Sequence, residues 1–321
     1  MTKVIFDEAA ISGFLHANTR GTFMRRPEMA CEAAALREAG IDCAVLGFPW
    51  DAMCISRTGT NLGPKAIRAA SEQFSLYNAN LDLDLSDVFT IADVGDVPVV
   101  PGGATRTMAE AEALVGEILS AGAIPITLGG DHSINIACTR AFAKAHAKPG
   151  LILVDSHFDT ALEVGGEDLS HCCPIPRAID AGFDPKNIAI VGTNGWMNPK
   201  DEFAFVRDHG IALFPIEQVV EEGPVAVGEK ARKIAADGTD AVYLTFDIDS
   251  IDAAYAPGTG VPAIGGMTSR EAIALITTLA KGGLGGMDLV EVSPSFDHDG
   301  VTSRLAVHLI LDALGAMAAG R

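Results

Sequence analysis

The sequence is short of positive charge. Among its 321 residues, 23 Lys and Arg stand against 42 Asp and Glu, which gives a formal net charge of −19. No Lys/Arg cluster approaches the basic stripe of a nucleic-acid-binding protein, so we expect neither nucleic acid nor an anionic membrane as a partner. The acidic balance is compatible with a small cationic molecule, although net charge speaks mainly to solubility and steering.

Several short signals are missing as well. The six cysteines show no C-x-x-C spacing, which favours reduced thiols in a cytoplasmic protein. Residues 1–8 contain no apolar core of a signal peptide, and the apolar segment 305–319 is interrupted by His308 and Asp312. We therefore predict neither a secretion signal nor a membrane span. The P-loop, the G-x-S-x-G elbow and the H-E-x-x-H helix are absent too, so nucleotide binding has no support.

Short β-rich apolar runs alternate with helical patterns along the chain, which predicts a mainly parallel sheet covered by helices on both faces. The expected strands are 42–47, 90–94, 124–128, 151–155, 188–192, 211–214, 242–247 and 287–291. The expected helices are 27–39, 64–74, 105–121, 133–146, 198–209, 223–236, 269–281 and 302–319. No linker, repeat or shift in composition divides the chain, so we expect a single α/β domain over residues 1–321, with an amino-terminal arm of roughly residues 1–25.

Three of the apolar runs lead directly into acidic and histidine residues. Asp131-His132 follows the run 123–128, the segment 155–159 follows 150–154, and the segment 247–249 follows 241–246. Strands that end in carboxylates and imidazoles, rather than in Gly-rich phosphate loops, indicate that their carboxyl ends jointly hold divalent metal. A single Asp-x-Asp at a strand end is more often a helix cap or a turn. Three such segments together favour the metal site.

The number and type of these side chains indicate two ions. An extended backbone would point Asp155, His157 and Asp159 to one side, and Asp247 and Asp249 would do the same from another strand end. Together with the second histidine they offer more oxygen ligands than a four-coordinate structural zinc takes. They suit a pair of Mn-like or Ni-like ions bridged by carboxylates, roughly 3.5–4 Å apart.

Four blocks of sequence resemble the ureohydrolase superfamily of arginase, agmatinase and guanidinobutyrase. They are Leu-Gly-Gly-Asp-His-Ser at 128–133, Val-Asp-Ser-His-Phe-Asp at 154–159, residues 245–252 leading into 256–260, and Asp-Leu-Val-Glu-Val-Ser-Pro at 288–294. Segments 47–51 and 59–68 resemble the agmatinase branch in particular. The match runs from about residue 40 to 310. The resemblance implies a three-layer α/β/α fold with an eight-stranded parallel sheet, assembling as homotrimers or homohexamers.

The resemblance also implies a binuclear metal cluster, usually of Mn²⁺, with Ni²⁺ as an alternative. Its six ligands would be His132, Asp155, His157, Asp159, Asp247 and Asp249. Four carboxylates would offset two divalent ions, and a bridging hydroxide would leave the cluster near −1, which favours a guanidinium substrate. The ions would lower the pKa of bound water, and attack on the guanidinium carbon would give urea and an amine. We count Asp159 among the catalytic residues as well.

Two further catalytic residues follow from the resemblance. Glu291 matches the glutamate that holds the guanidinium by paired charge-assisted hydrogen bonds, although alone it could be a surface carboxylate at a strand end. His171, in Ser170-His171-Cys172-Cys173, falls where relatives have a Ser-His-Gly block whose histidine shuttles protons to the leaving amine. A lone loop histidine is usually only exposed.

Departures from the family pattern lie where the substrate tail would bind. Ala161 stands where arginase-like members have an asparagine for the amino acid end of arginine, which disfavours arginine. Asn194 removes a charge, and Trp196 would add an aromatic wall that could hold a cation with roughly 0.5–2 kcal/mol, unless it is plain core packing. The predicted substrate-binding residues are Glu291, Trp196, Asn194, Ala161, Met53, Cys54 and Cys172.

Agmatine and 4-guanidinobutyrate are therefore the default substrates. The altered tail residues make simple or N-alkylated guanidines or biguanides an alternative. A non-catalytic subunit that supports a paralogous partner in a mixed oligomer is a second alternative. A single-zinc amide hydrolase of the deacetylase type shares the fold but should lack the full set of six ligands. Cys172-Cys173 as a nucleophile or redox pair has no base partner at a readable spacing.

Overall fold

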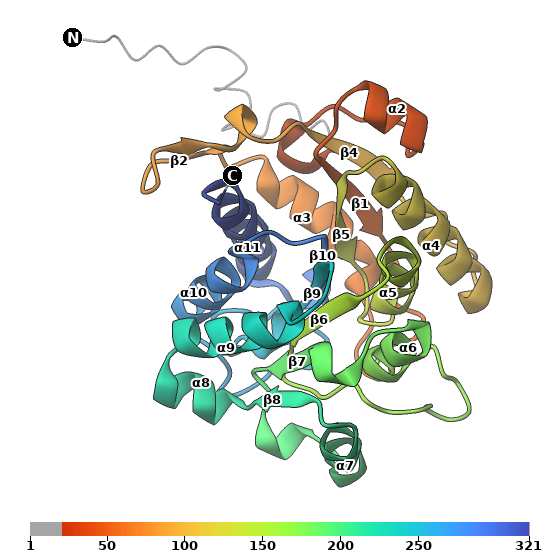
Figure 1. Cartoon of the computed structure of the whole chain (residues 1–321), viewed down its shortest axis with the longest axis vertical. Helices are drawn as coiled ribbons and strands as arrows, with labels where there is room; N and C mark the ends of the chain where they lie inside the picture. The colour runs from red at the N-terminus through yellow and green to blue at the C-terminus, as the bar shows by residue number, and fades with distance from the viewer. Residues whose placement is uncertain (1–20, 321) are drawn as a thin grey trace.

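The fold is built around one sheet of eight parallel strands, seen in a computed structural model that describes residues 21–320. The predicted amino-terminal arm lies mostly outside these residues. The strand order is β4-β1-β5-β10-β9-β6-β7-β8, and Figure 1 shows the sheet running through the centre of the molecule. The strands are β1 (Cys43–Phe48), β4 (Ile91–Asp96), β5 (Ile124–Gly129), β6 (Pro149–Val154), β7 (Ile188–Val191), β8 (Ala212–Phe214), β9 (Ala241–Asp247) and β10 (Gly286–Val290). Each predicted strand is present, with ends shifted by a few residues.

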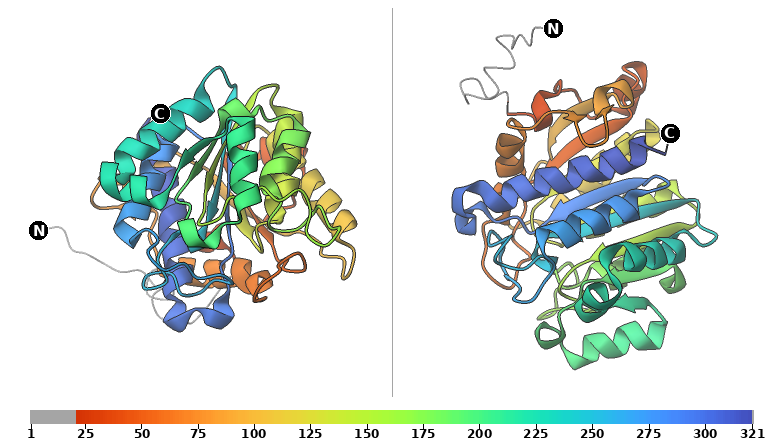
Figure 2. Two further views of the ribbon diagram at one scale, coloured as in Figure 1. Left: turned by 90° about the horizontal axis from the view of Figure 1, so that it is seen from below. Right: turned by 90° about the vertical axis from the view of Figure 1, so that its left-hand side faces the viewer.

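Alternate residues along each strand face two separate hydrophobic cores. In β6, Ile152 and Val154 belong to one core, whereas Leu151 and Leu153 belong to the other. Helices cover both faces (Figure 2), so the three-layer α/β/α architecture is confirmed. The first face is covered by α3 (Gly63–Ser71), α8 (Ile216–Glu222), α9 (Pro224–Ala236), α10 (Ser269–Ala280) and α11 (Val301–Ala318). The second is covered by α2 (Ala33–Glu38), α4 (Ala104–Ser120), α5 (Ile134–Ala145), α6 (Pro174–Ala181) and α7 (Lys200–His209).

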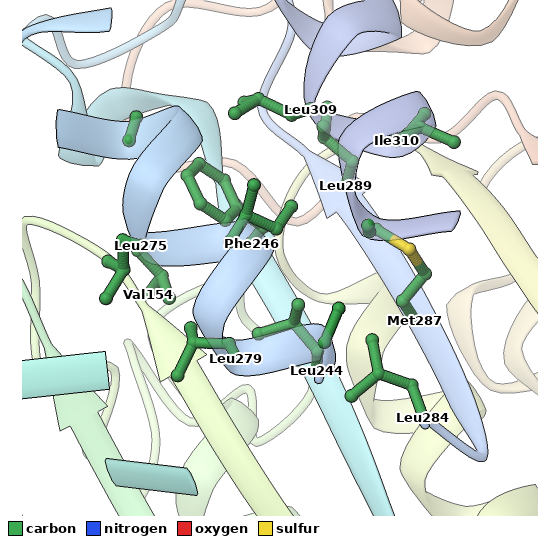
Figure 3. Close-up of a cluster of buried hydrophobic side chains, with 14 of the residues drawn as sticks. Val154, Leu244, Phe246, Leu275, Leu279, Leu284, Met287, Leu289, Leu309 and Ile310 are labelled. Carbon is green, nitrogen blue, oxygen red and sulfur yellow. The ribbon is translucent and has the colours of Figure 1, made fainter. Parts of the chain in front are cut away.

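The centre of the first core lies between β9, β10 and helices α10 and α11. Figure 3 shows Phe246 of β9 and Leu289 of β10 beside Leu275 of α10 and Leu309 of α11. Burying one such side chain contributes roughly 1.5–3 kcal/mol. The helical segment His298–Ala318 is long and apolar enough to cross a membrane by length and composition, yet 61% of its apolar window is buried. We interpret α11 as a core helix.

Some elements differ from the prediction. The helix expected over 27–39 is confined to α2, because Glu28 forms a β-bridge with Asp93 and Met29 donates its N–H to the Asp93 carbonyl. Helices α6 and α8 were not predicted. α6 begins with Pro174 in its first turn, where a missing N–H costs nothing. A short antiparallel pair, β2 (Tyr77–Asn78) and β3 (Leu83–Asp84), lies outside the main sheet.

Candidate metal centre and active site

Four adjacent strands in the middle of the sheet deliver the candidate residues. The order β5-β10-β9-β6 places the carboxyl ends of these strands side by side. His132 follows β5, Glu291 follows β10, Asp247 ends β9, and Asp155 follows β6. A parallel α/β sheet binds ligands at this edge, because the polar loops collect there.

Each of the three predicted metal-binding segments begins with the same small turn. An aspartate Oδ1 accepts a hydrogen bond from the backbone N–H two residues later, which bends the chain as soon as the strand ends. The three donor and acceptor pairs are Ser133 N to Asp131 at 3.0 Å, His157 N to Asp155 at 2.6 Å, and Asp249 N to Asp247 at 2.8 Å.

The expectation of an extended backbone over 155–159 is therefore wrong. Ser156 and His157 form a bend, and Asp159 has a φ of 51°, in the left-handed region that few side chains adopt. The side chains still converge, but through a turn. A residue keeps such a strained backbone conformation where contacts with its surroundings hold it in place. Here Ile175 donates its N–H to the Asp159 carbonyl, and Thr160 donates its N–H to Glu202.

One imidazole nitrogen faces three carboxylates. His132 Nδ1 lies 2.9 Å from Asp155 Oδ2, 2.9 Å from Asp159 Oδ2 and 3.2 Å from Asp247 Oδ2. Nδ1 can carry one proton at most, so it cannot satisfy three acceptors. His132 Nδ1 and Asp155 Oδ2 are both fully buried without a well-aligned hydrogen bond. Lone pairs that converge in this way fit a bound cation.

The other side of the His132 ring is fixed by hydrogen bonds. Nε2 lies 2.8 Å from Thr245 Oγ1, and Thr245 donates its own proton to Asp288 Oδ1. Thr245 must then accept from Nε2, so the ring proton sits on Nε2 and the Nδ1 lone pair points into the site. Asn135 and Tyr243 also donate to the buried Asp288. Outer partners of this kind orient metal-binding histidines.

The second histidine forms the other half of the cluster. His157 Nδ1 lies 3.2 Å from Asp155 Oδ1 and 3.3 Å from Asp249 Oδ2. Asp155 belongs to both groups of converging ligand atoms, with His132 and Asp247 on one side and with His157 and Asp159 on the other. The donors thus suit two ions that share Asp155, and nitrogen and carboxylate donors are those that Mn²⁺ and Ni²⁺ accept.

The protonation behaviour of these groups reflects the same crowding. Burial and the neighbouring charge of Asp249 raise the pKa of Asp247 well above its usual range. Burial alone would lower the pKa of His132, but Asp155, Asp159 and Asp247 outweigh it and raise the pKa. The site attracts positive charge, and protons compete with any metal for the same donors.

Glu291 and His171 adjoin the cluster. Glu291 has a φ of 63°, and its Oε1 accepts a hydrogen bond from His132 N at 2.9 Å. The same oxygen lies 2.9 Å from His171 Nδ1. On the far side of the ring, Nε2 accepts from Ile55 N at 3.1 Å, so the ring proton sits on Nδ1 and faces Glu291.

Gly130 and Gly260 make room for this arrangement. A Cβ on Gly130 would stand 2.2 Å from the Trp50 carbonyl oxygen, so only glycine lets the chain pass between β1 and β10 on its way to His132. A Cβ on Gly260 would stand 2.8 Å from the Arg57 carbonyl oxygen and 3.7 Å from Glu291 Oε2. Glycine therefore keeps the space beside the Glu291 carboxylate open.

Comparison with known proteins gives the family. The Arginase family model matches residues 41–315. The chain is 35% identical over 301 residues to the mitochondrial agmatinase of Gallus gallus, covering 91% of this chain and 87% of that protein. The chain belongs to the arginase family.

Two more relatives agree with this assignment. The guanidinobutyrase of Pseudomonas aeruginosa is 34% identical over 294 residues, with 91% of each chain covered. The solved proclavaminate amidino hydrolase of Streptomyces clavuligerus superposes with a TM-score of 0.87 at 30% identity, over 95% of this chain and 99% of that one. The arginase-family chain is thus an amidinohydrolase with a His/Asp cluster that can hold metal.

The cluster opens into a cavity of 310 Å³. Five of the six predicted metal ligands line it, and Asp155 lies buried beside them. His171, Glu291 and Cys172 line it as well. The other lining residues are Ile55, Ser56, Met197, Asn198, Pro199, Glu202 and Val261.

Most of the predicted tail-binding residues do not line this cavity. Trp196 lies in the 3-10 helix η5 (Gly195–Met197) with its ring fully exposed, so it is neither a wall of the cavity nor core packing. Asn194 uses its side-chain amide on the Ile264 carbonyl at 2.8 Å. Three others, Met53, Cys54 and Ala161, are also absent from the lining. Ile55, which follows Cys54, and Met197, which follows Trp196, line the cavity instead.

Three acidic residues at the site received no role from the sequence, although Asp131 stands beside His132 in one of the three predicted metal-binding segments. Asp131 is fully buried and accepts from Met53 N at 3.0 Å. Asp288 anchors Thr245 beneath His132. Both adjoin family motifs, so their positions in Gly-Gly-Asp-His-Ser and Asp-Leu-Val-Glu could have indicated a role. Glu202, in the first turn of α7, had no such signal.

Proposed function

We propose that this chain hydrolyses a small guanidino compound to urea and an amine, using two divalent ions of the Mn²⁺ or Ni²⁺ type. The observation that supports it is the meeting of Glu291 and His171 with the His/Asp cluster in one 310 Å³ cavity. The two ions would be held by His132, Asp155, His157, Asp159, Asp247 and Asp249. When bound, they would lower the pKa of a water molecule so that it becomes a nucleophile near neutral pH.

The residues of the chain supply the remaining requirements. Glu291 is a buried carboxylate, already fixed by His132 N–H, and it would hold the guanidinium by charge-assisted hydrogen bonds with its carbon above the cluster. His171 holds a proton at Nδ1, next to Glu291, and would pass a proton to the leaving nitrogen. Water adds to the guanidinium carbon, the C–N bond breaks, and urea and the protonated amine leave.

Further aspects of the proposal come from the family. We propose a single domain, a homotrimer or homohexamer, and a cytoplasmic location, although a relative such as the chicken agmatinase is mitochondrial by name. Agmatine remains a default substrate, and simple or N-alkylated guanidines remain the alternative.

Urea release tests the proposal. Protein freed of metal by chelation is reloaded with Mn²⁺ or Ni²⁺ and offered guanidine, methylguanidine, agmatine and 4-guanidinobutyrate. We expect metal-dependent urea from at least one of them. Asp249→Asn should lose both bound metal and urea release, whereas the exposed Asp237→Asn should keep both. Activity that persists in Asp249→Asn after its metal is lost would refute the mechanism.

A further inference from the structure

The charge of the cavity lining is one-sided. Asp159, Asp247, Asp249, Glu291 and Glu202 all contribute carboxylates to it. Within residues 21–320, no Lys or Arg lines the cavity. Two divalent ions would offset these three aspartates together with the buried Asp155, and a guanidinium would offset Glu291. Glu202 is then left as a negative charge without a partner in the lining.

Arg57, which directly follows two residues of the lining, is already engaged. Arg57 follows Ile55 and Ser56, but its guanidinium donates from Nε to the Gly260 carbonyl and from Nη2 to the Thr259 carbonyl, both at 2.8 Å. Its Cζ also lies 3.9 Å from the centre of the Phe296 ring. Arg57 therefore joins two loops and does not offer its charge to a ligand in the cavity.

Glu202 is held in place by the loop that carries Asp159. Its Oε2 accepts from Thr160 N at 3.0 Å, and Thr160 Oγ1 donates to the Glu202 backbone carbonyl at 3.2 Å. The side chain is partly buried and enters the lining beside Asn198 and Pro199. A fixed carboxylate in so small a cavity lies close to any substituent that a bound guanidinium carries.

We propose that Glu202 determines specificity by excluding guanidino acids, so that the substrates are guanidines with a neutral or cationic substituent. The inference rests on the proposed function. A carboxylate tail beyond the metal cluster would lose its hydration, would meet no Lys or Arg of the cavity lining, and would face Glu202. This sets the chain apart from its relative in Pseudomonas aeruginosa, which is named for guanidinobutyrate, a guanidino acid.

The experiment compares 4-guanidinobutyrate with agmatine and methylguanidine in the metal-loaded enzyme. We expect the wild-type kcat/KM for the acid to be at least about tenfold below that for the better of the other two. Glu202→Gln removes the charge but keeps an oxygen for Thr160 N–H. The substitution should raise the ratio of kcat/KM for 4-guanidinobutyrate to kcat/KM for agmatine by about tenfold. The matched control is Asp201→Asn, an exposed acid one residue earlier on α7, which should leave the ratio unchanged.

The outcomes separate this inference from the proposed function. A wild-type enzyme that prefers 4-guanidinobutyrate overturns the role of Glu202 and leaves urea formation intact. An equal loss on every substrate in Glu202→Gln would show that Glu202 only positions the Asp159 loop, which also overturns it. If no guanidine gives urea, the proposed function fails. Calorimetric binding of 4-guanidinobutyrate and of agmatine to the wild type and to Glu202→Gln then decides the specificity. Glu202→Ala provides a second variant whose ratio should shift in the same direction, even if its rates fall.

Discussion

The backbone N–H of Ile55 donates a 3.1 Å hydrogen bond to Nε2 of His171. This contact, together with Glu291 at Nδ1, fixes the imidazole from both sides. A second proton on the ring would have to bind Nε2, which would then lose its hydrogen bond from Ile55 N. The surroundings of the ring nevertheless favour protonation. Burial alone would lower the pKa of His171, but contacts with Cys172 and Glu291 outweigh burial and raise the pKa. The loop that carries Ile55 therefore controls where the ring keeps its proton.

Replacing this imidazole should affect turnover. His171→Asn keeps a polar group near Glu291 but removes the group that carries the proton, so we expect kcat to fall by about 10²–10⁴-fold with a smaller change in KM. Steady-state urea release measures both constants. His209→Asn, at an exposed histidine in the last turn of α7, is the control and should keep full activity. An unchanged kcat in His171→Asn would contradict the proposed role.

The two-loop contact of Arg57 should matter for substrate binding. Arg57→Lys keeps the charge but loses the planar fork that reaches the Thr259 and Gly260 carbonyls together. We expect KM to rise by about tenfold, because Ile55 and Ser56 line the cavity from the released loop. Arg37→Lys, at an exposed arginine that donates to the Ser120 carbonyl, should leave KM unchanged. Equal KM values for the two variants would show that the contacts of Arg57 with the Thr259 and Gly260 carbonyls do not affect substrate binding.

The support beneath His132 should set metal affinity. Thr245→Val keeps the shape of the side chain but removes the acceptor for Nε2 and one donor to Asp288. Metal affinity should fall by about 10–100-fold, measured by competition with a chromogenic chelator. The unpaired buried groups should also cost about 1–3 kcal/mol of unfolding free energy. Thr277→Val, which loses only a bond to its own helix backbone, is the matched control and should bind metal normally.

Tyr243 gives a prediction about pH. Burial and the charge of Asp288 raise its pKa well above 10 in the folded protein. Above pH 10 the unfolded chain releases this proton while the folded chain keeps it, so the stabilising contribution is complete below pH 10 and declines as the pH rises further. Between pH 10 and 11 the unfolding free energy of the wild type should fall by about 1 kcal/mol more than that of Tyr243→Phe.

Denaturant unfolding at pH 9, 10 and 11 measures the difference. Below pH 10, Tyr243→Phe should be the less stable protein, because it loses the hydrogen bond to Asp288. Tyr255→Phe, at an exposed tyrosine, should follow the wild-type pH dependence. Parallel curves for the wild type and Tyr243→Phe would mean that Tyr243 ionises as readily in the folded as in the unfolded protein.

The fold was predictable because its strands are buried on both faces. A run such as Leu-Ile-Leu-Val at 151–154 has no polar side that would suit a helix surface, and its residues divide between the two cores. The candidate metal ligands could be located for a related reason. They follow the strands immediately, and the carboxyl ends of neighbouring parallel strands must meet.

The tail side of the cavity depends on geometry that no local pattern reveals. Asn198 Nδ2 donates to the Ser156 and Asn194 carbonyls and so ties the end of η5 to the Asp155 loop. Met197 and Pro199 line the cavity there, and Trp196 is exposed to solvent. Glu202 lines the site while its carboxylate accepts from the Thr160 N–H. Both depend on contacts between segments some 40 residues apart.

Two of the three aspartate turns, those of Asp155 and Asp247, have a consequence for ion selection. Asp155 and Asp247 each commit Oδ1 to a backbone N–H and direct Oδ2 toward His132. Oδ1 keeps a second lone pair, as the sharing of Asp155 between two ions requires. If one ion took both oxygens of the same carboxylate, however, it would pull Oδ1 away from its turn. Calcium takes six to eight oxygens and commonly grips a carboxylate by both, so the backbone itself disfavours it. Smaller ions that accept a nitrogen donor and single carboxylate oxygens suffer no such penalty. The backbone hydrogen bonds of the two aspartates thus disfavour ions that need many oxygen ligands, independently of which donor atoms an ion prefers.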